Sequence, residues 1–138
     1  MNTKAFVLLG LFALAGCDQA AKETAHNAPQ STQAKGELKL ADGSIFILNA
    51  AFKRSYEKPN SGGKLSMHEY SYSSIDKIAE NDVYLHLQKA GYKRKVMSNE
   101  NNVYKVHYYK KDTPVVGAVY TARDNDKVTV ATLYWQEK

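Results

Sequence analysis

Apolar and polar residues alternate along most of the second half of the chain. Alternation with a period of two is typical of strands that bury one face. The alternating segments are 92–97, 103–111, 115–122 and 127–135. Short polar stretches rich in turn-forming residues separate them, such as SNENN at 98–102. The pattern therefore predicts an antiparallel meander.

A different period precedes this meander and predicts one helix. Ser73 and Asp76 approximate a capping box, and Gly91 supplies the left-handed residue at which a helix ends. Asn81 and Asp82 leave open a break into two shorter helices. The apolar stripe, with residues three or four positions apart, consists of Ile75, Ile78, Ala79, Val83, Leu87 and Ala90.

Three further segments complete the fold prediction. Residues 37–40 and 44–48 are apolar runs on either side of an Asp-Gly pair, which indicates a hairpin. Residues 53–64 are charged and contain Pro and Gly, which indicates a mobile loop. Residues 65–72 alternate and are typical of an edge strand. The expected fold class is α+β: an antiparallel sheet of about five to seven strands with one main helix packed on one face, in a single domain over 37–138.

The N-terminus has the pattern of an export signal. Residues 5–16 (AFVLLGLFALAG) carry no charge and follow Lys4. As a helix they would span about 18 Å, which is too short to cross a hydrocarbon core of about 30 Å. The segment is therefore interpreted as the apolar region of a cleaved signal peptide, residues 1–16.

The only cysteine of the chain, Cys17, ends this apolar region. Leu14-Ala15-Gly16-Cys17 resembles the lipobox of bacterial lipoproteins, in which small residues precede a cysteine that is acylated. The resemblance implies lipidation of Cys17, which becomes the first residue of the mature chain and anchors it to a membrane. It also implies a location in the cell envelope, on the inner or outer membrane, with the domain in the periplasm or at the cell surface.

Residues 18–36 lack Val, Ile, Leu, Phe, Met and aromatic residues, so we expect a flexible tether between the anchor and the domain. Asp18 and Gln19 resemble an inner-membrane retention signal, and the choice between the two membranes stays open. With its one thiol acylated, the mature chain has neither a disulfide nor a thiol active site. No second transmembrane segment is expected downstream.

The sequence favours a protein that is not an enzyme. The four histidines, His26, His68, His86 and His107, show none of the close spacings that zinc sites use, so neither a metal nor a cofactor is expected. The serines at 71–74 lack the surroundings of a nucleophile elbow. The acidic residues fall mostly in loops or on the polar side of the helix, so no pair of catalytic carboxylates is indicated.

One stretch does suggest a binding surface. In 103–111, one side of the expected strand holds Lys105, His107, Tyr109 and Lys111, while Tyr104, Val106 and Tyr108 take the core side. A basic and aromatic surface is suited to an anionic partner. It also has a purely structural explanation, because aromatic residues favour strands and lysine protects exposed sheets from aggregation.

We therefore expect a membrane-tethered, non-enzymatic lipoprotein of the envelope that binds a protein or cell-wall partner. An inhibitor or immunity-type protein is one form of such a module. Because the protein is expected to be exported, no nucleic-acid partner is expected. The alternatives are an accessory structural subunit of a secretion or assembly machine and a small hydrolase or metal-binding protein.

Overall fold

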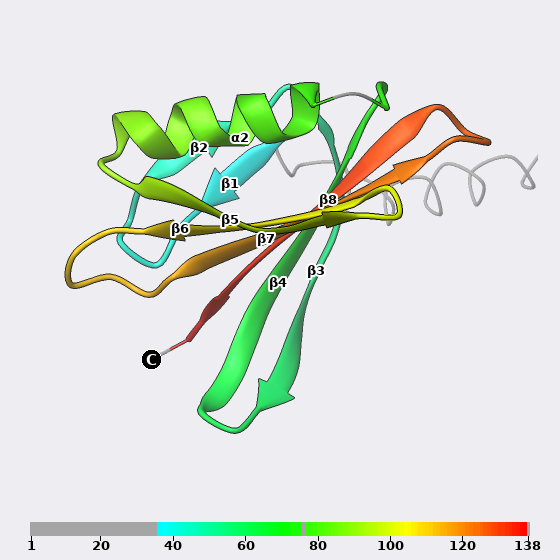
Figure 1. Ribbon diagram of the computed structural model, residues 1–138. Coiled ribbons are helices and arrows are strands. Elements are labelled where there is room, and N and C mark those ends of the chain that lie inside the picture. Colours follow the sequence, from blue (N-terminus) through cyan, green and yellow to red (C-terminus); the bar gives the residue numbers. More distant parts are fainter. Residues whose placement is uncertain (1–35, 76, 138) are drawn as a thin grey trace, which may run out of the picture. The chain divides into compact units, whose positions relative to one another are not determined.

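A six-stranded antiparallel sheet dominates the computed structural model, with the strand order β3-β4-β8-β7-β6-β5 (Figure 1). The structure describes residues 36–75 and 77–137, which belong to one compact unit, Gln33–Lys138. The predicted signal peptide, the predicted lipidation site Cys17 and the predicted tether up to Lys35 lie outside the described residues. The six strands are β3 (Ala51–Asn60), β4 (Gly63–Tyr72), β5 (Lys93–Glu100), β6 (Val103–Tyr109), β7 (Val116–Arg123) and β8 (Val128–Gln136).

One face of this sheet is covered by two elements. The helix α2 (Ile78–Lys89) lies across it, and beside the helix lies a separate two-stranded hairpin, β1 (Glu37–Lys39) and β2 (Ile45–Ile47). The fold is therefore α+β, as the periodicities predict. Figure 1 shows α2, β1 and β2 on the same side of the sheet.

The core lies between the sheet and these covering elements. Ala79, Val83 and Leu87 of α2 are buried, which confirms part of the predicted apolar stripe. Every second residue of β8 points into the core, and Leu133 and Trp135 are almost fully buried. The remaining core residues come from the strands and from positions that directly flank the hairpin, β3 or β5: Leu38, Leu40, Leu48, Ala50, Tyr70, Tyr72, Tyr92, Val106, Tyr108, Val116, Ala118, Tyr120 and Ala131.

The prediction of a mobile loop over 53–64 is wrong. Residues 51–60 form β3, which pairs with β4 from Ala51↔Ser71 to Asn60↔Gly63. The turn signals within 53–64 belong to the tight turn of this long hairpin, and Pro59 is tolerated because β3 is an edge strand. As a consequence, β4 pairs on both sides and is not the predicted edge strand.

The predicted start of the helix is also wrong. The helix begins at Ile78 with Lys77 as its N-cap and without a side-chain capping hydrogen bond, so a capping box from Ser73 does not start it. Ile75 and Ile78 are 49% and 54% exposed and do not join the apolar stripe. The helix continues through Asn81 and Asp82, and Gly91 has the predicted positive φ of 92° at its end.

Candidate binding face of the sheet

The face of the sheet opposite α2 is the open face, and its side chains alternate with those of the core. On β6, Val106 and Tyr108 are completely buried, whereas Lys105 is exposed and His107 is half-buried. Tyr109 is 40% exposed. Alternation along the sequence predicts that Lys105, His107 and Tyr109 share one face of the strand. In the structure all three lie on the open face.

The strand register carries a line of residues across this face. In β4 to β6 the pairs are Met67↔Tyr134, Tyr134↔Gly117 and Gly117↔His107. Lys95 of β5 continues the line beside His107, and Tyr56 of β3 begins it beside Met67. The candidate site is therefore assembled from every strand of the sheet.

Gly117 sits at the centre of the line and makes room for an aromatic ring. A Cβ atom added there would lie 2.2 Å from Cζ of Tyr134, so the tyrosine ring lies directly over the glycine. The ring crosses β7 in this way and brings its hydroxyl within 3.3 Å of Nε2 of His107. Only glycine allows this close approach.

His107 links two tyrosines. Its Nδ1 lies 3.3 Å from the hydroxyl of Tyr109, and its ring meets those of Tyr109 and Tyr134 edge to face at 6.1 and 6.4 Å. We call Tyr134, His107 and Tyr109 the aromatic row. Burial raises the pKa of Tyr134, so its hydroxyl stays protonated at neutral pH. Which group donates in each of the two contacts depends on the tautomer of the imidazole.

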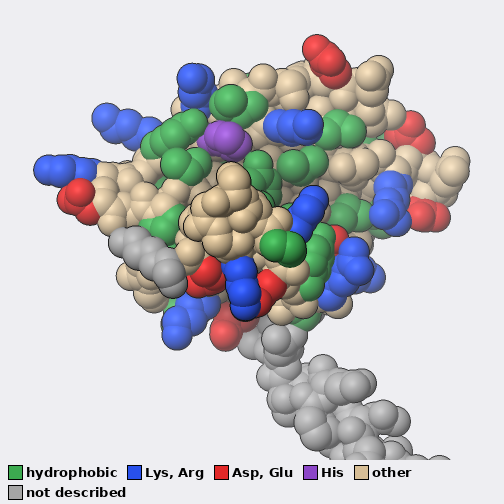
Figure 2. Space-filling view, turned by 90° about the horizontal axis from the view of Figure 1, so that it is seen from below, with side chains coloured by type: hydrophobic (Ala, Val, Ile, Leu, Met, Phe, Trp, Pro, Cys, Tyr) green, Lys and Arg blue, Asp and Glu red, His purple; other side chains and the backbone are tan. Residues whose placement is uncertain are grey.

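The charge around the aromatic row is positive. Lys95 and Lys105 are exposed beside it, and neither takes part in a salt bridge among the described residues. The acidic side chain near the row, Glu69, is occupied by a bidentate ion pair with Arg54 at 2.8 and 3.0 Å. Figure 2 views the molecule from the side opposite α2 and shows a histidine among hydrophobic side chains, with Lys and Arg around them.

Lys111 lies at the rim of the open face, because β6 ends at Tyr109 and the strict alternation ends with it. Together with Gly91, Lys93 and Tyr109 it lines a shallow hollow. Lys110 turns towards the covered side, where its Nζ donates to Asp42 at 2.8 Å. The predicted set of four is therefore three residues on the face and one at its edge.

Tyr134 and Gly117 were not among the residues expected at this site from the sequence. Tyr134 could have been found from the sequence, because alternation in 127–135 places its side chain on the other face of the strand from the buried Trp135. Gly117 gave no such signal, because its role depends on which strand lies beside β7.

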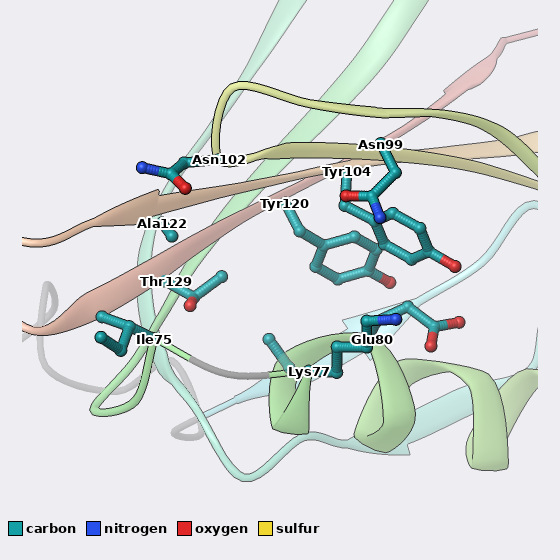
Figure 3. Close-up of a pocket in the computed structure, with 10 residues that line it drawn as sticks. Ile75, Lys77, Glu80, Asn99, Asn102, Tyr104, Tyr120, Ala122 and Thr129 are labelled. Carbon is teal, nitrogen blue, oxygen red and sulfur yellow. The ribbon is translucent and has the colours of Figure 1, made fainter.

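A second hollow lies on the covered side of the sheet, at the N-terminal end of α2 (Figure 3). It measures about 190 Å³. Its walls come from the helix start, the segment before it and strands β5 to β8: Ile75, Lys77, Ala79, Glu80, Asn99, Asn102, Tyr104, Tyr120, Ala122 and Thr129.

The buried polar groups of this hollow are already satisfied. Both carboxylate oxygens of Glu80 accept from Nη1 of Arg94 at 3.1 Å, and Tyr108 donates to the same carboxylate at 3.3 Å. The hydroxyls of Tyr108 and Tyr120 are 2.9 Å apart, and burial raises the pKa of both. Within residues 36–75 and 77–137, every buried side-chain nitrogen or oxygen has a partner. The arrangement is that of a stabilising polar network rather than a site prepared for a ligand.

The other features bearing on function are few. His68 stacks on Trp135 at 4.6 Å on the core side, and burial lowers its pKa. The described part of the chain holds no cluster of three or more His, Cys, Asp or Glu side chains placed to bind a metal ion. Nor does any helix within it have the length and apolar character needed to cross a bilayer.

Comparison with protein-family models, with curated proteins and with solved structures gives no match to this chain. Function must therefore be inferred from the residues of the open face and from the N-terminal sequence.

Proposed function

We propose that the protein is a membrane-tethered, non-enzymatic binding module of the bacterial envelope, and that its open sheet face binds an acidic surface on a protein partner. The observation that supports this most directly is the aromatic row over Gly117, flanked by Lys95 and Lys105 without acidic partners. The lipobox at 14–17 and the polar segment 18–36 support the anchoring and the tether.

The chemistry of the open face suits a protein partner. Tyrosine is enriched where proteins bind each other, because it contributes a large rigid surface and a hydroxyl at little cost in side-chain entropy. The mutual contacts of Tyr134, His107 and Tyr109 hold their rings in place before binding, which reduces the ordering cost further. A surface that extends across every strand of the sheet contacts a broad partner, whereas an enzyme or a small-molecule receptor needs a concave site.

The charge of the face determines the kind of partner. Because Arg54 neutralises Glu69, the lysines beside the row are left to attract negative charge. Electrostatic complementarity of this type speeds association and selects the partner. An acidic protein surface therefore fits the face.

The tether permits this binding at a distance from the membrane. Fully extended, residues 18–36 reach at most about 60 Å. The domain can therefore reach a partner in the envelope while Cys17 stays in the lipid.

The test is capture of the partner by crosslinking and pull-down of the lipidated protein from its native host. A triple variant, Lys105→Glu, His107→Ala and Tyr109→Ala, should lose capture, because it reverses one charge and dismantles the row. Its melting temperature should stay close to that of the wild type, since all three side chains lie outside the core.

Lys127→Glu is the matched control, because it reverses an exposed charge in the turn between β7 and β8. It should capture the partner normally. Unchanged capture by the triple variant would refute the role of the open face, and binding to purified cell-wall polymer in place of protein would refute the class of partner. Mass spectrometry of the N-terminus tests the anchor separately, since it requires an acylated Cys17.

A further inference from the structure

The covering layer has exposed apolar side chains of its own, on the side opposite the open face. Ile45 and Ile47 of β2 are 58% and 56% exposed. Ile78 and Leu85 of α2 are 54% and 46% exposed. We call these four residues the outer apolar surface. Folding does not explain them, because none is part of the core.

On the hairpin, isoleucine occupies positions where a half-buried strand calls for polar residues. Phe46 packs against the core and Leu48 is buried, so the alternating positions 45 and 47 point to solvent. The facing residues of β1, Lys39↔Ile45 and Glu37↔Ile47, are charged and exposed, as this side of a hairpin normally is. The two isoleucines are therefore the exception on an otherwise solvated face.

The helix continues this surface. Ile78 and Leu85 are seven residues apart and share one side of α2, away from the buried side of Val83 and Leu87. The hairpin is fixed to the neighbouring side of the helix. Phe46 contacts His86 with ring centroids 5.5 Å apart, and the backbone N–H of Asn49 donates to Asp82 at 2.8 Å.

The place where the chain enters the domain indicates what covers these residues. β1 begins at Glu37, directly after the segment that connects the domain to Cys17, and β1 is paired with the strand that carries both exposed isoleucines. If Cys17 is lipidated, the part of the domain closest along the chain to the lipid anchor is therefore the hairpin that carries both exposed isoleucines. Exposed Lys39 and Lys89 lie on the same two elements and suit an anionic lipid surface.

We propose that the outer apolar surface docks on a bilayer containing anionic phospholipid. The isoleucine and leucine side chains enter the interface between headgroups and acyl chains, while the lysines remain among the headgroups. The docking is weak by itself and becomes effective because the anchor keeps the domain close to the membrane. It turns the open face away from the membrane, where a partner has access to it. The inference rests on the proposed lipid anchor.

A single added thiol can test this docking, because the native chain has only Cys17 and lipidation consumes it. Asn81→Cys places the thiol on α2 beside Leu85, and the matched control Lys95→Cys places it on the open face. Each lipidated variant is labelled with an environment-sensitive fluorophore and reconstituted into vesicles of phosphatidylethanolamine and phosphatidylglycerol. The label at position 81 should shift its emission to shorter wavelength and be quenched by spin-labelled lipid. The label at position 95 should do neither.

The double substitution Ile45→Asn and Ile47→Asn should abolish the emission shift of the label at position 81. The control is Val96→Asn with Val115→Asn, which changes two exposed apolar residues outside the outer apolar surface. It should leave the emission shift in place. Equal emission at positions 81 and 95 in the acylated protein would overturn the proposal, as would a shift that persists in the isoleucine variant. A shift at position 81 that also occurs in detergent and grows with protein concentration would mean self-association, which also overturns it. An unmodified Cys17 would instead refute the anchor itself, and mass spectrometry of the same samples detects that outcome.

Discussion

The two faces of the sheet use the same amino acid in opposite ways. On the covered face, Tyr70 and Tyr72 are buried and donate their hydroxyl hydrogen bonds to the carbonyl of Glu37 at 2.7 Å and to Asp82 at 2.9 Å. On the open face, Tyr109 and Tyr134 remain accessible and contact His107. The comparison teaches that alternation decides on which side of the sheet a tyrosine lies, while the elements around it decide whether its hydroxyl meets a covering element or a neighbour in the sheet.

The covering elements supply the acceptors that the buried tyrosines need. α2 contributes Glu80 and Asp82, and the hairpin contributes a carbonyl group and Asp42. A buried hydroxyl without an acceptor costs about 1–3 kcal/mol, so each of these contacts stabilises the fold. On the open face the hydroxyls of Tyr109 and Tyr134 instead lie near His107 of the sheet itself, and their rings stay accessible for binding.

The largest expected effect comes from removing the central acceptor of the covered face. Glu80→Ala leaves the hydroxyl of Tyr108 and the guanidinium of Arg94 without their shared partner. The unfolding free energy should fall by about 3 kcal/mol, since breaking a buried ion pair leaves the other charge unpaired; Arg94 is partly exposed, which keeps the loss at the lower end of the range. Urea denaturation measures this loss.

Glu80→Gln is the matched control, because it keeps an acceptor for Tyr108 and removes only the charge. Its loss should be clearly smaller. Equal stability of Glu80→Ala and the wild type would mean that the buried network does not hold the helix on the sheet.

Low pH should also reduce the stability of the covered side, through the carboxylate of Asp42 in the turn of the β1–β2 hairpin. Burial by itself raises the pKa of Asp42, but hydrogen bonds from Lys110, Ser44 and Tyr92 outweigh this and lower it to about 2. A carboxylate with a lowered pKa contributes its full stability above its unfolded pKa of 3.8, and loses it as the pH falls towards 2. The contribution is at most about 2 kcal/mol.

The measurement compares the wild type with Asp42→Asn by thermal unfolding between pH 7 and pH 2. The wild type should be more stable above about pH 4, and the difference should shrink steadily below that value. Glu57→Gln, which removes one partner of the exposed pair with Lys64, is the control and should show little difference at any pH. A difference for Asp42→Asn that does not depend on pH would show that the carboxylate charge is not what fixes the hairpin.

Much of the comparison between the two faces could be predicted from the sequence, because it depends on local periodicity. Alternation in 103–111 alone assigns Tyr108 to the core and Tyr109 to the open face. The positive φ of 92° at Gly91 was likewise expected from a glycine at the end of an apolar helix stripe.

Features that depend on distant pairing were not predictable in this way. The charges and glycines of 53–64 indicate a loop by composition, yet the segment is ordered by pairing with β4. The register of β7 against β6 and β8 brings Gly117 beneath Tyr134, and that register is a property of the whole sheet. Ile78 was assigned to the helical stripe by its spacing, but it lies on the side of α2 away from Val83 and Leu87 and is exposed.

The smallest expected change in stability is at Gly117, where a single methyl group should alter the open face without affecting the covered one. Alanine at this position places its Cβ 2.2 Å from Cζ of Tyr134, so the ring must move off β7 and away from His107. The free energy of unfolding should change by less than about 1 kcal/mol, because alanine is favoured over glycine in a strand and Tyr134 can turn into solvent. NMR should show the His107 ring signals losing the shift caused by Tyr134, and partner capture should weaken.

Thr121→Ala, on the same strand and the same face but away from the row, should leave both unchanged. Retention of the His107 signals in Gly117→Ala would mean that Tyr134 does not need the glycine, and that the aromatic row is not held in place by the sheet beneath it.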